Sequence, residues 1–97
     1  MKQTTKQLIA HFRIVNKHIV QVDVSKYPSD SDVIHFEGGY ELIIDDDAAL
    51  PTVLLEEKMH VGGNVNIASW VIDKDAILGE VATAVAKLYS GLRNNQP

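Results

Sequence analysis

The chain contains 97 residues and no cysteine, and its formal net charge is −4. This length fits one domain around one modest core, and a composition of 45% hydrophobic and 23% charged residues is typical of a globular protein. The lack of cysteine excludes a disulfide scaffold, a thiolate zinc site and a cysteine nucleophile. The negative charge argues against a general nucleic-acid binder.

We therefore expect a single domain over residues 1–97, with residues 1–4 and 93–97 as flexible tails. No apolar segment follows the N-terminus that is long enough to resemble a signal peptide or to cross a bilayer. Together with the absence of cysteine, this predicts a cytoplasmic protein.

The charge is concentrated in the middle of the chain. Residues 1–25 carry four basic side chains and one acid, a net of +3, whereas residues 26–60 carry two lysines and nine acids, a net of −7. Residues 61–97 are balanced. Such asymmetry is typical either of an acidic binding surface or of segments that face each other or solvent.

Two segments show helical periodicity. Residues 75–92 place apolar side chains at three- and four-residue spacing, which predicts an amphipathic helix. In the first segment, Thr4 with Gln7 fits a capping box. We predict a helix over residues 5–16, although Leu8 and Phe12 also belong to an alternation that would fit a strand.

Alternating valines from Val20 to Val24 predict a half-buried strand, and a hairpin comes after it. In that hairpin a three-residue loop, Glu37 to Gly39, pairs Phe36 with Tyr40. This register places the larger apolar side chains on one face, whereas a shift by one residue would mix the two faces.

A second hairpin is predicted around Gly62-Gly63-Asn64. The same reasoning pairs Val61 with Val65. The reverse face of this hairpin then carries a second apolar surface, which consists of Leu54, Ala68, Trp70 and Ile72. Either the N-terminal helix covers this surface, or it is an interface, where tryptophan is a frequent anchor.

Five aspartates come together at the open end of the first predicted hairpin. They are Asp30, Asp32, Asp45, Asp46 and Asp47. Clustered carboxylates can bind Ca²⁺ or Mg²⁺, attract a basic protein, or lie in a solvated loop. Because EF-hand spacing is missing, we predict no metal site and retain these residues as a candidate acidic partner site.

Few other residues suggest chemistry. The four histidines lack zinc-site spacing, and no serine lies in a nucleophile motif. His35 is predicted opposite Glu41 as a cross-strand pair on the outer face of the first hairpin. Glu57 is the one acid that alternation places on an apolar face, where it is an acid catalyst, lies at a sheet edge, or pairs with Ser69. We predict no catalytic residue, no cofactor and no metal.

These patterns predict an α+β fold. It has an N-terminal helix, about five mostly antiparallel strands including two hairpins, and a long C-terminal helix packed on one sheet face. The predicted function is that of a small acidic interaction or assembly module without catalytic activity, which forms a homodimer through the Trp70 face. The alternatives are an acidic inhibitor or adaptor that binds a basic partner through the aspartates, and a metal- or carboxylate-dependent enzyme. The expected partner is a second copy or another protein, with no membrane and no direct nucleic-acid binding.

Overall fold

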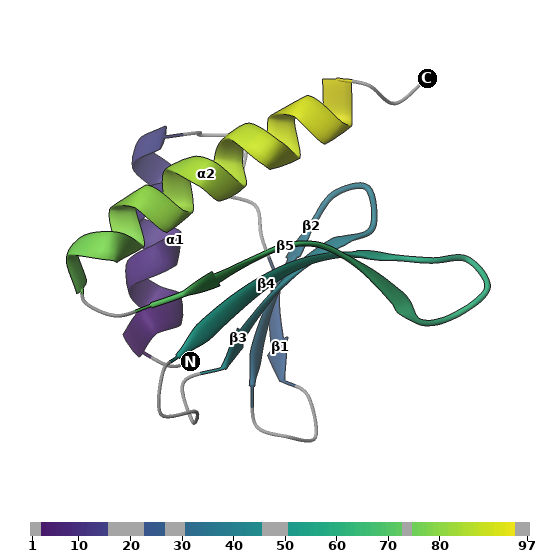
Figure 1. Ribbon diagram of the computed structural model, residues 1–97, viewed down its shortest axis with the longest axis horizontal. Coiled ribbons are helices and arrows are strands. Elements are labelled where there is room, and N and C mark those ends of the chain that lie inside the picture. The colour runs from purple at the N-terminus through teal and green to yellow at the C-terminus, as the bar shows by residue number, and fades with distance from the viewer. Residues whose placement is uncertain (1–2, 16–22, 27–30, 46–50, 73–74, 95–97) are drawn as a thin grey trace.

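The computed structural model describes residues 3–15, 23–26, 31–45, 51–72 and 75–94. In chain order the elements are α1 (Gln3–Val15), β1 (Asp23–Lys26), β2 (Asp32–Phe36), β3 (Tyr40–Asp45), β4 (Thr52–Lys58), β5 (Asn64–Val71) and α2 (Asp75–Asn94). The strands form one antiparallel sheet in the order β1-β2-β3-β4-β5, and the predicted α+β fold is confirmed (Figure 1).

Both helices bury one apolar stripe. In α2 the buried side chains include Leu78, Val81 and Val85, which follow one another at three- and four-residue spacing. In α1 the buried Leu8 and Phe12 lie one turn apart, so the helical interpretation of this segment is confirmed and the strand alternative is wrong.

The helix ends differ from the prediction. The structure begins α1 at Gln3, which places Thr4 inside the helix instead of at its cap. It extends α2 to Asn94. Residues 3–4 and 93–94, which were predicted as parts of flexible tails, are therefore helical. α1 begins before its first apolar residue, Leu8, and α2 continues past its last, Leu92, and sequence periodicity detects neither extension.

The first hairpin has the predicted register. Phe36 pairs with Tyr40, and Asp32 pairs with Ile44. The loop contains Gly38 and Gly39 with φ angles of 90° and 83°, which side chains other than glycine rarely adopt. In front of this hairpin, β1 pairs with β2 so that Val24 lies opposite Ile34. Val20 and Val22, the start of the predicted strand, lie outside the described residues.

The register predicted for the second hairpin is wrong. Val65 pairs with Glu57 instead of Val61, and Ser69 pairs with Leu54 instead of Glu57. A five-residue connection from Met59 to Gly63 replaces the predicted three-residue loop, and the Met59 amide donates to the Gly63 carbonyl at 3.0 Å. The ladder also shifts between Leu55 and Glu56, which leaves Ile67 as an extra residue in β5.

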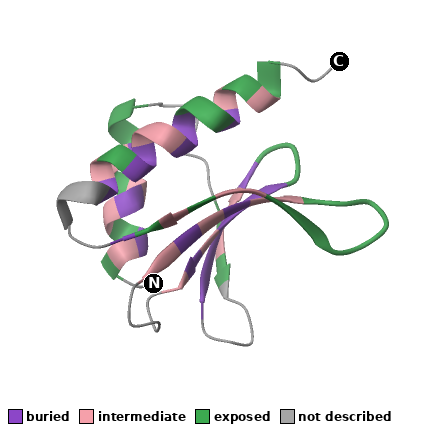
Figure 2. Cartoon of the chain, viewed as in Figure 1, coloured by how far each residue is buried: buried purple, intermediate pink, exposed green. Residues whose placement is uncertain are grey.

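The two helices pack on the same side of the sheet, so the molecule has two layers (Figures 1 and 2). We call this the helix-facing side. Its core contains side chains from both helices and from alternate strand positions, among them Leu42 and Leu55 at 0% exposure. No described helix or strand covers the other side of the sheet, which we call the open side. The alternative in which the N-terminal helix covers a second face is therefore wrong.

Aromatic rings join the helices to the first hairpin. Phe36 lies between Phe12 on α1 and Tyr89 on α2, with ring centroids 5.8 Å and 5.1 Å away. Tyr89 also meets Tyr40 edge-to-face at 5.9 Å. Burial raises the pKa of the Tyr89 phenol above its usual value. No described helix is both long enough and apolar enough to cross a membrane.

A buried hydrogen bond fixes α1 to the sheet. The Thr5 hydroxyl donates to Oδ2 of Asp32 at 2.6 Å, and both residues are 0% exposed. Asp32 occupies a helix-facing position because it alternates with Ile34 along β2. A carboxylate at this depth requires hydrogen-bond donors, since burial without them is costly.

We expect Thr5→Val to destabilise the protein by about 1–3 kcal/mol. This nearly isosteric change removes the hydroxyl that Asp32 accepts from and leaves the carboxylate less satisfied in the core. Thr83→Val is the matched control, because the Thr83 hydroxyl donates to a carbonyl of its own helix. Urea unfolding followed by circular dichroism measures both variants, and equal effects would contradict the role given to Thr5.

Candidate functional site

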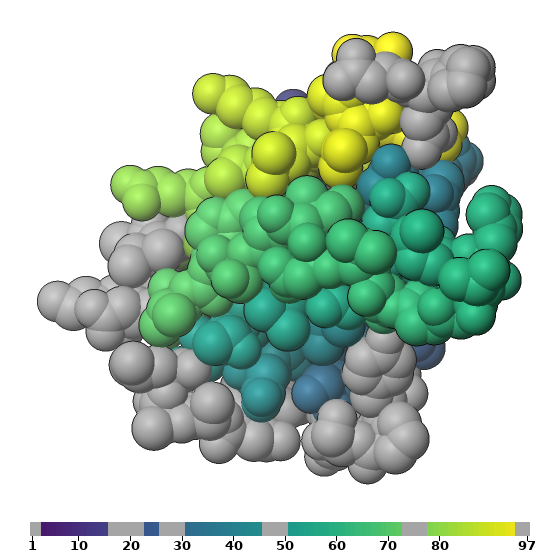
Figure 3. Space-filling model, turned by 45° about the vertical axis from the view of Figure 1, so that its right-hand side comes forward, coloured from purple at the N-terminus to yellow at the C-terminus, as the bar shows by residue number. Residues whose placement is uncertain are grey.

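The candidate association surface is the free edge of the sheet along β5. This strand pairs only with β4 among the described strands, and none of its eight residues is buried. Its sequence, NVNIASWV, contains neither charge nor proline. Proteins that remain monomeric commonly protect an edge strand with lysine, proline or a covering segment, because its backbone groups can pair with another chain. Figure 3 shows this strand, in green, crossing the face of the molecule.

The distal end of the β4–β5 hairpin extends away from the body of the molecule. Every residue from Lys58 to Asn66 is exposed, and Figure 2 shows this part as one continuous exposed ribbon. Three apolar side chains lie here, with exposures of 41% for Met59, 95% for Val61 and 49% for Val65. An exposed apolar group at the end of an arm is typical of a contact surface.

The bulge determines which way the β5 side chains point. Val65 pairs with Glu57, which in turn pairs with the buried Tyr40, so Val65 lies on the helix-facing side. Ala68 and Trp70 lie on that same side, opposite Leu55 and Val53. Ile67, the extra residue of the bulge, also packs against the core.

The apolar surface predicted on the reverse of the second hairpin is not one surface. Leu54 pairs with Ser69 on the open side, whereas Ala68 and Trp70 lie on the helix-facing side. Ile72 is 7% exposed and belongs to the core. Strict alternation from Val65 to Val71 had grouped these residues, and the extra residue at Ile67 reverses the alternation for the second half of the strand.

The two described members of the predicted aspartate cluster also lie on opposite sides of the sheet. Asp32 is buried toward the helices, while Asp45 pairs with Thr52 on the open side. Asp30, Asp46 and Asp47 lie outside the described residues. Since Asp32 is occupied by Thr5, it cannot join a surface that binds a basic partner. No three or more His, Asp or Glu side chains within the described ranges are arranged to hold a metal ion.

A polar network crosses the open side of the sheet. Ser25 Oγ lies 2.7 Å from Nε2 of His35, and Nδ1 of His35 lies 3.6 Å from Oε1 of Glu41. Asn64 Nδ2 donates to Glu41 at 3.4 Å and to Glu56 at 3.0 Å. The predicted cross-strand pair of His35 and Glu41 is confirmed. The sequence did not indicate Ser25, because no motif marks a contact made through the pairing of β1 with β2.

Glu57 is half-buried on the helix-facing side, as alternation predicted. It lies between Tyr40 on β3 and Val65 on β5, without the predicted neighbour Ser69. The position is near the end of the strand, where the hairpin leaves the core.

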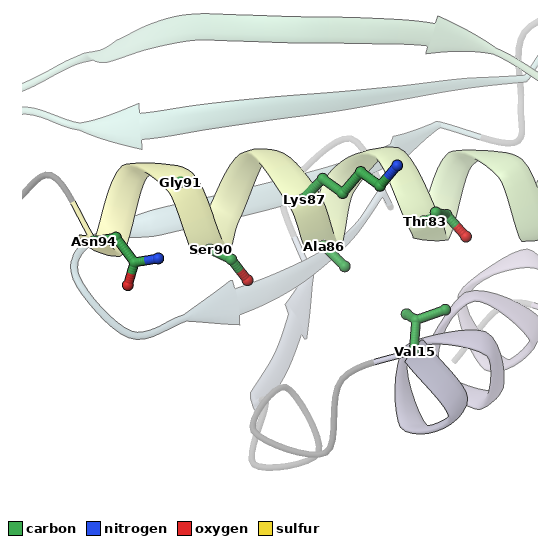
Figure 4. Close-up of a pocket in the computed structure, with 7 residues that line it drawn as sticks. All are labelled: Val15, Thr83, Ala86, Lys87, Ser90, Gly91 and Asn94. Atoms are coloured by element: carbon green, nitrogen blue, oxygen red, sulfur yellow. The ribbon is translucent and has the colours of Figure 1, made fainter.

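A groove of about 560 Å³ lies where the end of α1 meets α2 (Figure 4). Val15 of α1 forms one side, and the opposite side is formed by Thr83, Ala86, Lys87, Ser90, Gly91 and Asn94 of α2. Most of these side chains are small, and Lys87 is the only charged residue among them.

Comparisons with protein-family models, curated proteins and solved structures find no match to this chain.

Proposed function

We propose that this protein is an assembly module that forms a homodimer by antiparallel pairing of two β5 strands. The observation that supports this proposal most directly is the exposed, uncharged edge of eight residues. Half of the backbone donors and acceptors of an edge strand point away from its one neighbour. A second strand would satisfy them and would join two five-stranded sheets into one.

The bulge favours a second copy over an unrelated strand. Asn64 and Asn66 point to the open side of the sheet, and Val65 between them points to the helix-facing side. The next two residues, Ile67 and Ala68, both point to the helix-facing side. The remaining three positions repeat the first three in reverse order. A regular strand alternates strictly, so it could match both halves of β5 only by leaving one residue of the bulge unpaired, as β4 does.

A second copy matches the whole strand in one register. With the twofold axis between Ile67 and Ala68, residue 64 lies opposite residue 71, and every cross-strand pair has both side chains on the same side of the sheet. Asn66 then faces Ser69 on the open side, and Val65 faces Trp70 on the helix-facing side. A shift of one residue in either direction would oppose side chains that point to different sides.

Size-exclusion chromatography with light scattering tests the proposal. We expect a mass near twice the 10.7 kDa of the chain at high micromolar concentration, and a decrease toward that of one chain on dilution. A mass of one chain at the highest soluble concentration would contradict the proposal.

A further inference from the structure

Ser25, His35 and Glu41 lie on three consecutive strands of the open side and contact one another in sequence. His35 lies directly opposite Glu41 on β3, and Ser25 is a diagonal neighbour of His35 on β1. Two contacts join them, at 2.7 Å from Ser25 to His35 and at 3.6 Å from His35 to Glu41. Because β1 and β5 are opposite edges of the sheet, Ser25 and His35 lie away from the proposed dimer edge, and Asn64 of β5 touches only the carboxylate of Glu41.

The two contacts use different ring nitrogens. The Ser25 hydroxyl lies at Nε2, and the Glu41 carboxylate lies at Nδ1. A neutral imidazole with its proton on Nδ1, the ring nitrogen nearer the carboxylate, leaves Nε2 as an acceptor for the hydroxyl proton. A hydroxyl, a base within hydrogen-bond reach and a third group that orients the base together form the arrangement that activates a serine nucleophile.

The exposure of the three side chains decreases from Ser25 through His35 to Glu41, so that the hydroxyl is open to solvent and the carboxylate is sheltered. Ser25 is exposed, the His35 side chain is 38% exposed, and the Glu41 side chain is only 10% exposed. The reacting hydroxyl is therefore accessible from solvent, while the carboxylate is sheltered and also held by Asn64. Because β1 is an edge strand, an amide N–H of Ser25 or of its neighbours points away from β2. A backbone donor of this kind can stabilise the oxyanion of acyl transfer.

We propose that Ser25 is a nucleophile, activated by His35, that accepts acyl or phosphonyl groups from small esters and related electrophiles. In acyl transfer the Ser25 oxygen bonds to the carbonyl carbon and the bond to the leaving alkoxide breaks. The hydroxyl proton passes to Nε2 of His35 and then to the leaving oxygen. Water then attacks the acyl-serine, gives its proton to His35, and releases the acid as Ser25 regains its proton.

A fluorophosphonate probe tests the proposal on the intact protein. Ser25 oxygen would bond to phosphorus, fluoride would leave, and the hydroxyl proton would pass to His35. Mass spectrometry of the peptides should place a single adduct on Ser25. We expect Ser25→Ala to lose the adduct and His35→Gln to form it at least about a hundredfold more slowly. Ser90→Ala and His60→Gln are the matched controls and should react like the unaltered chain.

A further variant separates a chemical role of His35 from a structural one. His35→Ala should lose labelling and recover part of it when free imidazole is added, because imidazole in solution can accept the Ser25 proton. Circular dichroism would first establish that each variant is folded. Labelling of Ser25 no faster than of Ser90, or an equal rate in a folded His35→Gln variant, would overturn the proposal.

Discussion

Leu42→Ala is expected to lower the free energy of unfolding by about 3–5 kcal/mol. Leu42 lies in the central strand β3, between Ile34 and Leu55, and all three are 0% exposed. Truncation removes the transfer free energy of the buried atoms and leaves a cavity that a paired sheet cannot easily close. Urea unfolding measures the change, with the fluorescence of the single tryptophan, Trp70, as the signal.

Leu88→Ala is the control for this change. The side chain of Leu88 is 39% exposed on α2, so the same truncation removes less buried area than at Leu42 and leaves no closed cavity, and alanine is a good helix former. We expect a loss of about 1 kcal/mol, well below that of Leu42→Ala. A similar loss in both variants would show that Leu42 is not at the centre of the core.

We expect charged substitutions at residues 66 and 69 of β5 to weaken the dimer when they place like charges opposite each other, and to preserve it when they place opposite charges there. In the proposed register, residue 66 of one copy lies opposite residue 69 of the other. Asn66→Lys with Ser69→Lys therefore places like charges opposite each other twice, whereas Asn66→Lys with Ser69→Glu places opposite charges there. Each cross-strand charge pair contributes roughly 0.2–1 kcal/mol. We expect the dissociation constants of the two variants to differ about ten- to a hundredfold.

The reversed pair, Asn66→Glu with Ser69→Lys, has the same net charge as the Lys–Glu variant, controls for which position carries which charge, and should dimerise like it. Analytical ultracentrifugation over a dilution series gives the three constants. If all three variants associate equally, another surface joins the copies. If the unaltered chain dimerises but the Lys–Glu variant does not, the register is wrong while the dimer itself stands.

The first hairpin could be predicted from sequence because strict alternation continues through both strands. Phe36 and Tyr40 bracket a loop whose glycines permit only a narrow set of turns, so loop length and apolar pattern agree on one register. The pairing of His35 with Glu41 followed from that register without further information. α2 was equally accessible, because a long periodic stripe identifies a helix without knowledge of its neighbours.

The second hairpin could not be predicted because its pattern is broken by one residue. With the bulge at Ile67, β5 is apolar at positions that belong to both alternation phases, and two phases fit the sequence about equally well. The contact of Ser25 with His35 was inaccessible for another reason. It depends on how β1 aligns with β2, and no turn motif between them fixes that register.

The order of the strands has a consequence for how the chain folds. Each strand pairs with the next one along the sequence, so the sheet forms through contacts that are local in the chain. The contact of α1 with α2 instead joins elements that are far apart in the chain, and α2 is made after the other described elements. We infer that the core beside α1 stays incomplete until α2 has emerged from the ribosome. Packing of α1 against α2 is then the late step in folding.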